Sequence, residues 1–304
     1  MIGRFGRTCR LSGHLALVAG GLGASLAPQD PPASFRATAD LVRVEVSVQR
    51  RSRPVTGLAA ADFEVRDNGV LQRVVSLEYG RLPIDLTIAL DVSGSVSGGT
   101  IDQLRRAIHD LMRDLAPQDR LRLLLFDSRI VAAADFGASA AEIEAAFTSV
   151  QPAGGTAVFD AMAVALAAPP DPDRRQLAVF FTDGEDEDST TTRAELLETA
   201  RHTTPTIGMV LASDRPWGAQ SATANASGRT IYEQLATETG GFLRTVAPGQ
   251  SLASAFRQIL ADFRQSYVIY FSPANIARTG FHELDVRVRG NDVEVHARRN
   301  YTAR

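Results

Sequence analysis

Two kinds of hydrophobic pattern divide the chain. From Leu41 to Gln49 apolar and polar residues alternate, which is typical of a strand with one buried face. From Ile84 onward, short apolar runs alternate with segments whose apolar residues recur at helical spacing, as in 101–115. The first pattern predicts a small β unit, and the second predicts an α/β domain.

The β unit is expected over residues 35–80. A turn is expected at Arg53-Pro54, and Asn68-Gly69 is a favoured pair for a two-residue hairpin turn. Residues 71–79 should then form one returning strand. A unit of this size is expected to pack on its neighbours. The C-terminal segment 266–304 also reads as strands, at 267–272, 283–288 and 293–297, and these are candidates to pair with residues 35–80.

Residues 82–265 are predicted to form the α/β domain. Its expected strands are 84–90, 121–126, 130–134 at an edge, 177–181, 206–211 and 242–246. Its expected helices are 101–115, 141–150, 158–168, 193–201, 231–239 and 252–264. This alternation implies a doubly wound, mostly parallel sheet with helices on both faces. Right-handed crossovers bring the strand-to-helix loops to one edge, where such sheets bind ligands.

The first 27 residues have the pattern of a secretory signal peptide. Three arginines precede the uncharged apolar stretch 15–27, which is too short to span a bilayer comfortably. We therefore expect export to the periplasm or the medium without a stable transmembrane anchor; a disordered N-terminus is the alternative. Residues 28–34, with three prolines, are expected to be a linker. The single cysteine, Cys9, lies in the signal, so the exported chain would have no thiol.

Charge and composition exclude several functions. The composition, with 44% hydrophobic and 22% charged residues, is that of an ordinary soluble globular protein. The formal net charge of -3 provides no basic field that would recruit nucleic acid or an anionic membrane. All 32 basic residues are arginine. Without lysine the chain has neither the amine of a Schiff base nor the lysine of a Walker-type phosphate loop.

Oxygen-bearing side chains lie in three loops at the predicted ligand edge. These loops are Asp91-Val92-Ser93-Gly94-Ser95, Gly154-Gly155-Thr156 and Thr182-Asp183-Gly184. They offer carboxylates and hydroxyls but no histidine or cysteine, which favours a hard cation such as magnesium, manganese or calcium. The alternative is that Asp91, Ser93 and Ser95 only cap the following helix.

Together these positions resemble the metal-ion-dependent adhesion site of von Willebrand factor type A domains. The matching residues are Asp91, Ser93, Ser95, Thr156 and Asp183, in the right order and with fitting spacing. The resemblance covers about residues 82–265 and implies a Rossmann-like domain that holds one divalent cation, with magnesium as first choice and manganese or calcium as alternatives. It further implies that the three hydroxyls coordinate directly and that the two carboxylates coordinate directly or through water.

The flanking sequence is similar to a bacterial subfamily of exported proteins that carry this domain. The similar stretches are 55–58, 62–63, 67–69, 239–241 and 267–270. The resemblance implies metal-dependent protein binding outside the cytoplasm, without catalysis. A protein partner would present an Asp or Glu that completes the metal coordination. Two other classes stay open: a metal-assisted or serine hydrolase, and a structural envelope protein.

The hydrolase hypothesis depends on a few residues. Gly94 to Gly98 only approximates the G-x-S-x-G nucleophile pattern, because its central residue is Val96 and the candidate Ser97 follows it. Ser97 also lies six residues past Asp91, whereas the pattern needs a sharp turn directly after the strand. The available histidines are His202, His282 and His296, of which only His202 lies in the α/β region. A metal-assisted hydrolase would need a carboxylate base such as Asp127 or Asp186.

Two further loops are expected near the metal edge. Residues 185–188 are all acidic, and they form either a solvated loop or a second cation site. Residues 213–230 are expected to form a long polar loop that carries Trp217, the only tryptophan. That side chain is either a local hydrophobic anchor or a contact to the partner.

Overall fold

The computed structural model describes residues 41–303 with these exceptions: Ser97, Glu185, 213–223, Pro248 and Asn291. The expected signal peptide 1–27 and linker 28–34 lie outside the described residues, as do Ser97 and Trp217.

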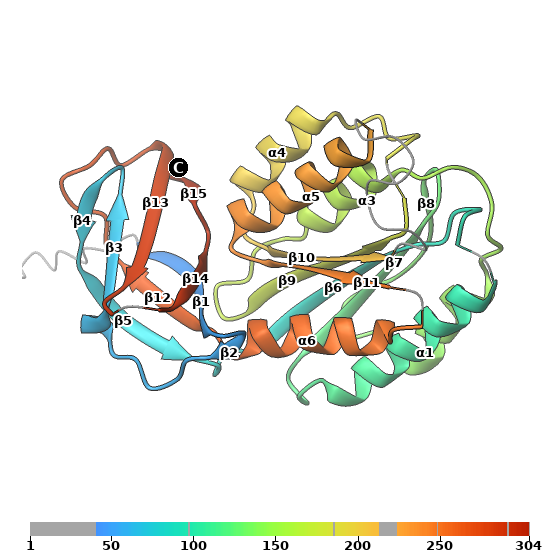
Figure 1. Cartoon of the computed structure of the whole chain (residues 1–304), viewed down its shortest axis with the longest axis horizontal. Helices are drawn as coiled ribbons and strands as arrows, with labels where there is room; N and C mark the ends of the chain where they lie inside the picture. The colour runs from blue at the N-terminus through green and yellow to red at the C-terminus, as the bar shows by residue number, and fades with distance from the viewer. Residues whose placement is uncertain are drawn as a thin grey trace, which may run out of the picture. The chain divides into compact units, whose positions relative to one another are not determined.

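The α/β domain is built on a six-stranded sheet with the order β11-β10-β9-β6-β7-β8 (Figure 1). Its strands are β6 (Ile84–Asp91), β7 (Arg120–Phe126), β8 (Ile130–Ala134), β9 (Arg175–Thr182), β10 (Thr206–Ala212) and β11 (Phe242–Val246). All neighbouring strands are parallel except β7 and β8, so β8 is an antiparallel edge strand. The doubly wound, mostly parallel fold class expected from the sequence is confirmed.

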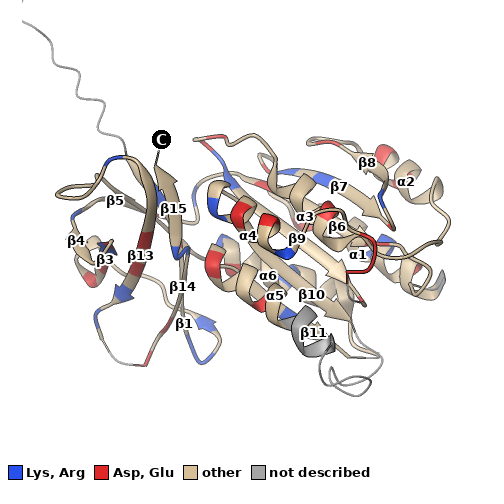
Figure 2. Ribbon diagram, turned by 90° about the horizontal axis from the view of Figure 1, so that it is seen from above, with Lys and Arg blue, Asp and Glu red and all other residues tan. Residues whose placement is uncertain are grey.

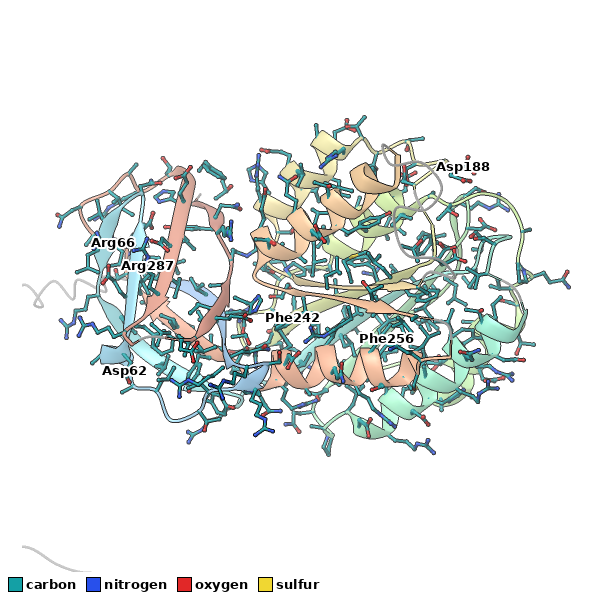
Figure 3. All side chains as sticks on the ribbon, in the orientation of Figure 1. Asp62, Arg66, Asp188, Phe242, Phe256 and Arg287 are labelled. Carbon is teal, nitrogen blue, oxygen red and sulfur yellow. The ribbon has the colours of Figure 1, made fainter. Side chains whose placement is uncertain are left out.

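Helices cover both faces of this sheet. They are α1 (Gly98–Asp114), α2 (Ala140–Thr148), α3 (Val158–Leu166), α4 (Arg193–His202), α5 (Ala224–Thr239) and α6 (Leu252–Arg264). One hydrophobic core joins α1, α2 and α6 to the sheet, and a second joins α3, α4 and α5 to the opposite face (Figure 1). Phe256 of α6 belongs to the first core and is 1% exposed (Figure 3). Every residue of the central strands β6 and β9 is buried, which explains their nearly continuous apolar sequences.

The N- and C-terminal segments together form a β module of two antiparallel sheets. One sheet has the order β14-β1-β12-β5, with β2 paired to β1, and the other has the order β15-β13-β3-β4. The strands are β1 (Val42–Arg50), β2 (Arg53–Pro54), β3 (Phe63–Asp67), β4 (Val70–Gln72), β5 (Val74–Tyr79), β12 (Tyr267–Phe271), β13 (Gly280–Val288), β14 (Glu294–Ala297) and β15 (Asn300–Ala303); a short 3-10 helix, η1 (Ala60–Asp62), precedes β3. Alternate residues of β1, β3, β12 and β13 form a third hydrophobic core in the module.

The α/β domain is inserted between two neighbouring strands of the module. The chain leaves the module after β5 and returns to it at β12, and these strands pair with Tyr79 opposite Tyr267. The two tyrosine rings lie 4.8 Å apart. Glu45 of β1 accepts a 2.8 Å hydrogen bond from Arg175 Nε of β9, and this guanidinium is fully buried. The strands that begin and end the insertion are therefore held together, and a buried ion pair joins the module to the α/β domain.

The structure corrects several expectations about local structure. The first hairpin turn lies at Arg51-Ser52, where φ is 50° and 58°, and Arg53-Pro54 begins the returning strand β2. The expected strand 71–79 is divided at Arg73, because β4 pairs with β3 in one sheet whereas β5 pairs with β12 in the other. Helix α5 begins at Ala224, so residues 224–230, which were expected to belong to the long loop, are helical. The strand β15 was not expected from the sequence.

Candidate metal centre

Strand register brings the predicted metal ligands to one edge of the sheet. In β6 and β9, Leu90 pairs with Phe181, so Asp91 and Thr182 end neighbouring parallel strands. Asp183 follows Thr182 directly, and the loop from Asp91 to Ser95 leads into α1. Thr156 does not follow a strand. It lies in the loop between α2 and α3, two residues before α3 begins.

The Asp91 carboxylate is completely buried and is held at both oxygens. Oδ1 accepts a 2.9 Å hydrogen bond from the Ser93 amide, and Oδ2 accepts a 2.7 Å hydrogen bond from Thr182 Oγ1. Burial raises the pKa of Asp91, the hydrogen bonds from Ser93 and Thr182 oppose that rise, and the charge of Asp183 adds to it. A cation beside Asp91 would offset the cost of keeping this carboxylate charged in a buried position.

Three more of the predicted ligands form a continuous polar chain. Ser93 Oγ lies 3.1 Å from Ser95 Oγ, and Ser95 Oγ donates a 2.9 Å hydrogen bond to Asp183 Oδ1. Ser93 is buried, and Asp183 is half-buried. The structure thus brings Asp91, Ser93, Ser95 and Asp183 into one connected group, although they come from two different loops.

The loop of Thr156 joins the same group through its backbone. The Gly94 amide donates a 3.2 Å hydrogen bond to the Gly154 carbonyl oxygen, which ties the first loop to the second. Gly154 has φ of +73°, a conformation that a residue with a Cβ rarely adopts. Thr156 itself is buried, and its carbonyl oxygen accepts hydrogen bonds from the amides of Glu187 and Asp188 at 2.8 and 3.2 Å. All three predicted loops are therefore directly connected.

The acidic loop after Asp183 has a structural role that the sequence did not indicate. Asp186 Oδ1 accepts a 3.0 Å hydrogen bond from the Phe159 amide in the first turn of α3, whose own N-cap residue, Ala157, supplies no side-chain cap. In return, the Asp160 carboxylate accepts hydrogen bonds from the amides of Thr190 and Thr191 at 3.0 and 2.8 Å. Asp186 is thus neither a solvated acid nor a free ligand, and it anchors the loop to α3.

Burial and hydrogen bonding give these two carboxylates opposite shifts. Burial raises the pKa of Asp186, and the hydrogen bonds from Ser189 and Phe159 oppose the rise. Burial also acts to raise the pKa of Asp160, but hydrogen bonds from Thr190 and Thr191 outweigh it, and the net pKa is lowered. Asp160 is therefore held in its charged form at the start of α3, where the helix dipole also favours a negative charge.

Gly155 allows the acidic loop to lie directly against the candidate metal centre. A Cβ at this position would collide with the Asp188 carboxylate and would lie 3.3 Å from Glu187 Oε2. Figure 3 shows Asp188 on this loop, which is drawn in red in Figure 2. Any side chain at residue 155 would force these two acidic residues away. The sequence shows a glycine at position 155, but it does not show that Asp188 and Glu187 pack against it.

The donor set fits a hard divalent cation. In the described part of the chain, no group of three or more His, Cys, Asp or Glu side chains is arranged to hold a metal ion. A centre at this edge therefore depends on hydroxyl oxygens together with the two carboxylates, which is the oxygen-only chemistry that magnesium, manganese and calcium prefer. Asp91 provides the buried negative charge that such an ion would compensate.

The side chains named for a hydrolase are engaged elsewhere. His282 Nδ1 lies 2.8 Å from Asp67 Oδ1 in the β module, and His202 pairs with Glu198 on α4. His296 lies on β14 with its ring 5.6 Å from that of Phe242. Asp127 Oδ1 accepts a hydrogen bond from the Arg129 amide within its own turn. These contacts do not assemble a nucleophile and base among the described residues.

In the described residues, no helix is long and apolar enough to cross a membrane.

Comparison with known proteins finds a family match over the part of the chain that carries this edge. Residues 86–185 match the family of von Willebrand factor type A domains. An uncharacterized protein of Synechocystis sp. is 33% identical over 111 residues, which are 35% of this chain and 26% of that protein. The match therefore spans about a quarter of that relative's length.

Solved structures are similar at low sequence identity. A von Willebrand factor type A protein from Catenulispora acidiphila is 13% identical, with a TM-score of 0.43 over 88% of this chain and 75% of that one. The conserved hypothetical protein BatB from Bacteroides thetaiotaomicron is 18% identical, with a TM-score of 0.43 over 59% of this chain and 98% of that one. The match to von Willebrand factor type A domains over residues 86–185 includes all five predicted metal ligands, Asp91, Ser93, Ser95, Thr156 and Asp183.

Proposed function

We propose that this protein is a divalent-metal-dependent protein-binding module that acts outside the cytoplasm and has no catalytic activity. The observation that carries the proposal is the polar chain from Ser93 through Ser95 to Asp183, beside the buried carboxylate of Asp91. The charge pattern of residues 1–27 supports export, because three arginines precede a short apolar stretch.

The metal would be held by the side chains of Asp91, Ser93, Ser95, Thr156 and Asp183. The hydroxyls of Ser93, Ser95 and Thr156 would coordinate directly. Both oxygens of Asp91 already accept hydrogen bonds, which favours coordination of this residue through water. Magnesium is the preferred ion, and manganese and calcium are the alternatives.

A protein partner would complete the coordination with an Asp or Glu carboxylate. When neutral hydroxyls contact the ion directly and a carboxylate such as Asp91 binds through water, less of the charge of the ion is compensated at direct contact, so the ion stays attractive to an additional carboxylate. The acidic residues Glu187 and Asp188 are exposed beside the centre and would repel acidic groups that approach from their side. The partner is therefore expected to approach from the side away from this loop.

Calorimetric titration of the folded protein with magnesium, manganese and calcium tests the metal centre. Wild type should bind one ion, Asp183→Ala should lose measurable binding, and Asp173→Ala should bind as wild type does. Asp173 is a matched control because it is exposed and lies before the first residue of β9, at the opposite end of that strand from Asp183. If well-folded wild type binds none of the three ions, the proposal fails.

A further inference from the structure

A groove runs along the free edge of the six-stranded sheet. Within the described residues, β8 pairs with β7 on one side only, and α2 packs against β8 (Figure 2). Between β8 and α2 lies a groove of about 490 Å³. Its walls include the consecutive residues 131–134 of β8 together with Ala145, Ala146 and Ser149 at the C-terminal end of α2. Consecutive residues of a strand point to opposite faces of the sheet. A groove that is lined by four consecutive residues of β8 therefore extends around the edge of this strand.

The edge of β8 lacks the features that normally prevent strand addition. Its sequence from Ile130 to Ala134 contains no charged residue and no proline. Its last three residues are alanines, so little side-chain volume stands between the strand edge and α2. Unpaired N–H and C=O groups on an edge strand are a template for another extended segment.

The groove begins at the same edge as the candidate metal centre. Register places Asp91 of β6 opposite Phe126 of β7, and Phe126 opposite Ile130 of β8. The other wall also leads there, because α2 ends at Thr148 and the chain then continues into the Gly154–Thr156 loop. Since β8 starts at this edge and runs away from it, the groove extends from the metal edge toward the opposite end of the sheet.

The two ends of the groove would differ in charge when the candidate metal centre is occupied. At the end far from the metal edge, Asp135 and Glu142 line the groove, and the Asp135 side chain is 91% exposed. At the near end, a bound divalent cation would provide positive charge. A complementary partner segment therefore has a basic residue at one end and an acidic residue at the other.

We propose that the groove binds an extended segment of the protein partner, which joins β8 as an additional antiparallel strand. An antiparallel segment runs toward the metal edge, so its basic residue precedes the strand and its acidic residue follows it. Neighbouring strands lie about 4.8 Å apart, so the added strand lies about 14 Å from β6, a distance that about four or five extended residues span. The partner motif is thus an Arg or Lys, about five residues with small apolar side chains at alternate positions, and then an Asp or Glu about four or five residues later. The acidic end of this motif rests on the proposed metal function; the strand addition does not.

The test uses a phage-displayed library of random 16-residue peptides, selected on the full chain in magnesium, and the best recovered peptide is then synthesised. Ala145→Tyr is the test variant, because Ala145 is an exposed helical residue whose side chain lines the groove. Ala141→Tyr is the matched control, because Ala141 is exposed on the same helix and does not line the groove. The proposal expects Ala145→Tyr to weaken peptide binding at least about tenfold and Ala141→Tyr to leave it unchanged.

Backbone pairing has a second signature that a side-chain contact lacks. In a strand ladder, only alternate residues of the added strand donate toward β8. N-methylation of the peptide at one alternate set should therefore abolish binding, and N-methylation at the other set should leave it nearly intact. The strand addition is overturned if no recovered peptide discriminates between the two tyrosine variants, or if both methylated sets behave alike.

Chelation separates this inference from the proposed metal function. If the metal function is right, EDTA or Asp183→Ala weakens the peptide, and so does replacement of its acidic residue by Asn or Gln. If only the strand addition is right, these changes have no effect, whereas Ala145→Tyr and one methylated set still abolish binding. If only the metal function is right, EDTA abolishes binding and Ala145→Tyr does not.

Discussion

Thr182 Oγ1 donates a 2.7 Å hydrogen bond to Asp91 Oδ2, and this contact joins the ends of the two central strands of the sheet. Both residues are completely buried. Thr182 Oγ1 also accepts a 3.2 Å hydrogen bond from the Gly184 amide, so one hydroxyl orients the Asp91 carboxylate and fixes the turn that carries Asp183. Thr182 is thus a positioning residue for both candidate carboxylate ligands.

Replacement of Thr182 by Val should destabilise the protein and weaken metal binding. The variant keeps the shape of the side chain but leaves a buried Asp91 oxygen without its donor, a loss that costs about 1–3 kcal/mol in the free energy of unfolding. Urea denaturation in EDTA measures the stability, and titration with magnesium measures the affinity. Thr182→Ser retains the hydroxyl and should lie close to wild type in both. Equal stability of Thr182→Val and wild type would show that the hydrogen bond has no such role.

Gly155→Ala should weaken metal binding more than it weakens the fold. The added methyl group collides with the Asp188 carboxylate and crowds Glu187, both on the exposed acidic loop, which can move without opening a hydrophobic core. Movement of that loop would disturb the amides of Glu187 and Asp188 that bond to the Thr156 carbonyl oxygen. Gly184→Ala is the matched control, since a Cβ there meets no atom within 4 Å. Equal magnesium affinities for the two variants would contradict the expected contribution of the acidic loop.

Much of the α/β domain follows from local sequence. The apolar runs of β6 and β9 predict buried central strands. When helices cover both faces of a sheet, the side chains of its central strands are buried on both sides, so they are apolar unless they form a hydrogen bond or an ion pair. Asp91, Ser93, Ser95 and Asp183 are predicted for a related reason: parallel strands place their following loops at one edge whatever the exact register. Thr156 lies between two helices, α2 and α3, and its place in the ligand set came from the resemblance to the known motif. The role of all five side chains as metal ligands, Asp91, Ser93, Ser95, Thr156 and Asp183, stays a prediction.

The contacts between segments far apart in the sequence were not predictable in the same way. Asp186 caps a helix that begins 28 residues earlier, at Val158, and no local pattern shows that α3 lacks a cap of its own. The change of sheet at Arg73 has no local turn signal, because residues 71–79 contain neither glycine nor proline. Such features depend on which surfaces meet in the folded chain. Hydrophobic periodicity and secondary-structure propensity are local properties and do not predict these contacts.

The buried pair of Arg175 and Glu45 should show strong coupling. Arg175 also donates to the Phe263 carbonyl oxygen and to Ser266 Oγ, both at 2.5 Å, so Arg175→Met leaves several buried acceptors unpaired. We expect a loss of about 3–5 kcal/mol in the free energy of unfolding. Glu45→Met in the same chain removes the uncompensated carboxylate and should recover part of that loss. Urea denaturation of both single variants and the double variant measures the coupling, and simple additivity of the two changes would contradict it.

His296 should make the protein less stable in mild acid. Burial lowers the pKa of His296 below its usual value of 6.5, although Glu294 acts in the opposite direction. The unfolded chain therefore takes up this proton at a higher pH than the folded protein does, and the free energy of unfolding falls as the pH drops below 6.5. In urea denaturation, the free energy of unfolding of His296→Gln should decline less steeply than that of wild type as the pH falls from 7 to below 6.5. A slope as steep as that of wild type would mean that other groups cause the decline.

Gly240 should be the glycine whose replacement most severely affects the contact between the β module and the α/β domain. It has φ of +74°, and a Cβ there would lie 2.5 Å from the backbone carbon of Ala297 and from the backbone nitrogen of Arg298. Those atoms cannot move freely, because the buried Arg298 side chain donates to the carbonyl oxygens of Ala200 and Pro205 at 3.0 and 2.9 Å.

Gly57→Ala provides the comparison that separates the two costs of this substitution. Gly57 has a similar φ of +80°, but a Cβ there meets nothing within 4 Å. It should therefore show only the conformational cost of about 1–2 kcal/mol. Gly240→Ala should show that cost and a further loss of about 1–3 kcal/mol from the steric clash. Urea denaturation of both variants measures the difference, and equal losses would mean that the module backbone can withdraw from Gly240 without disturbing Arg298.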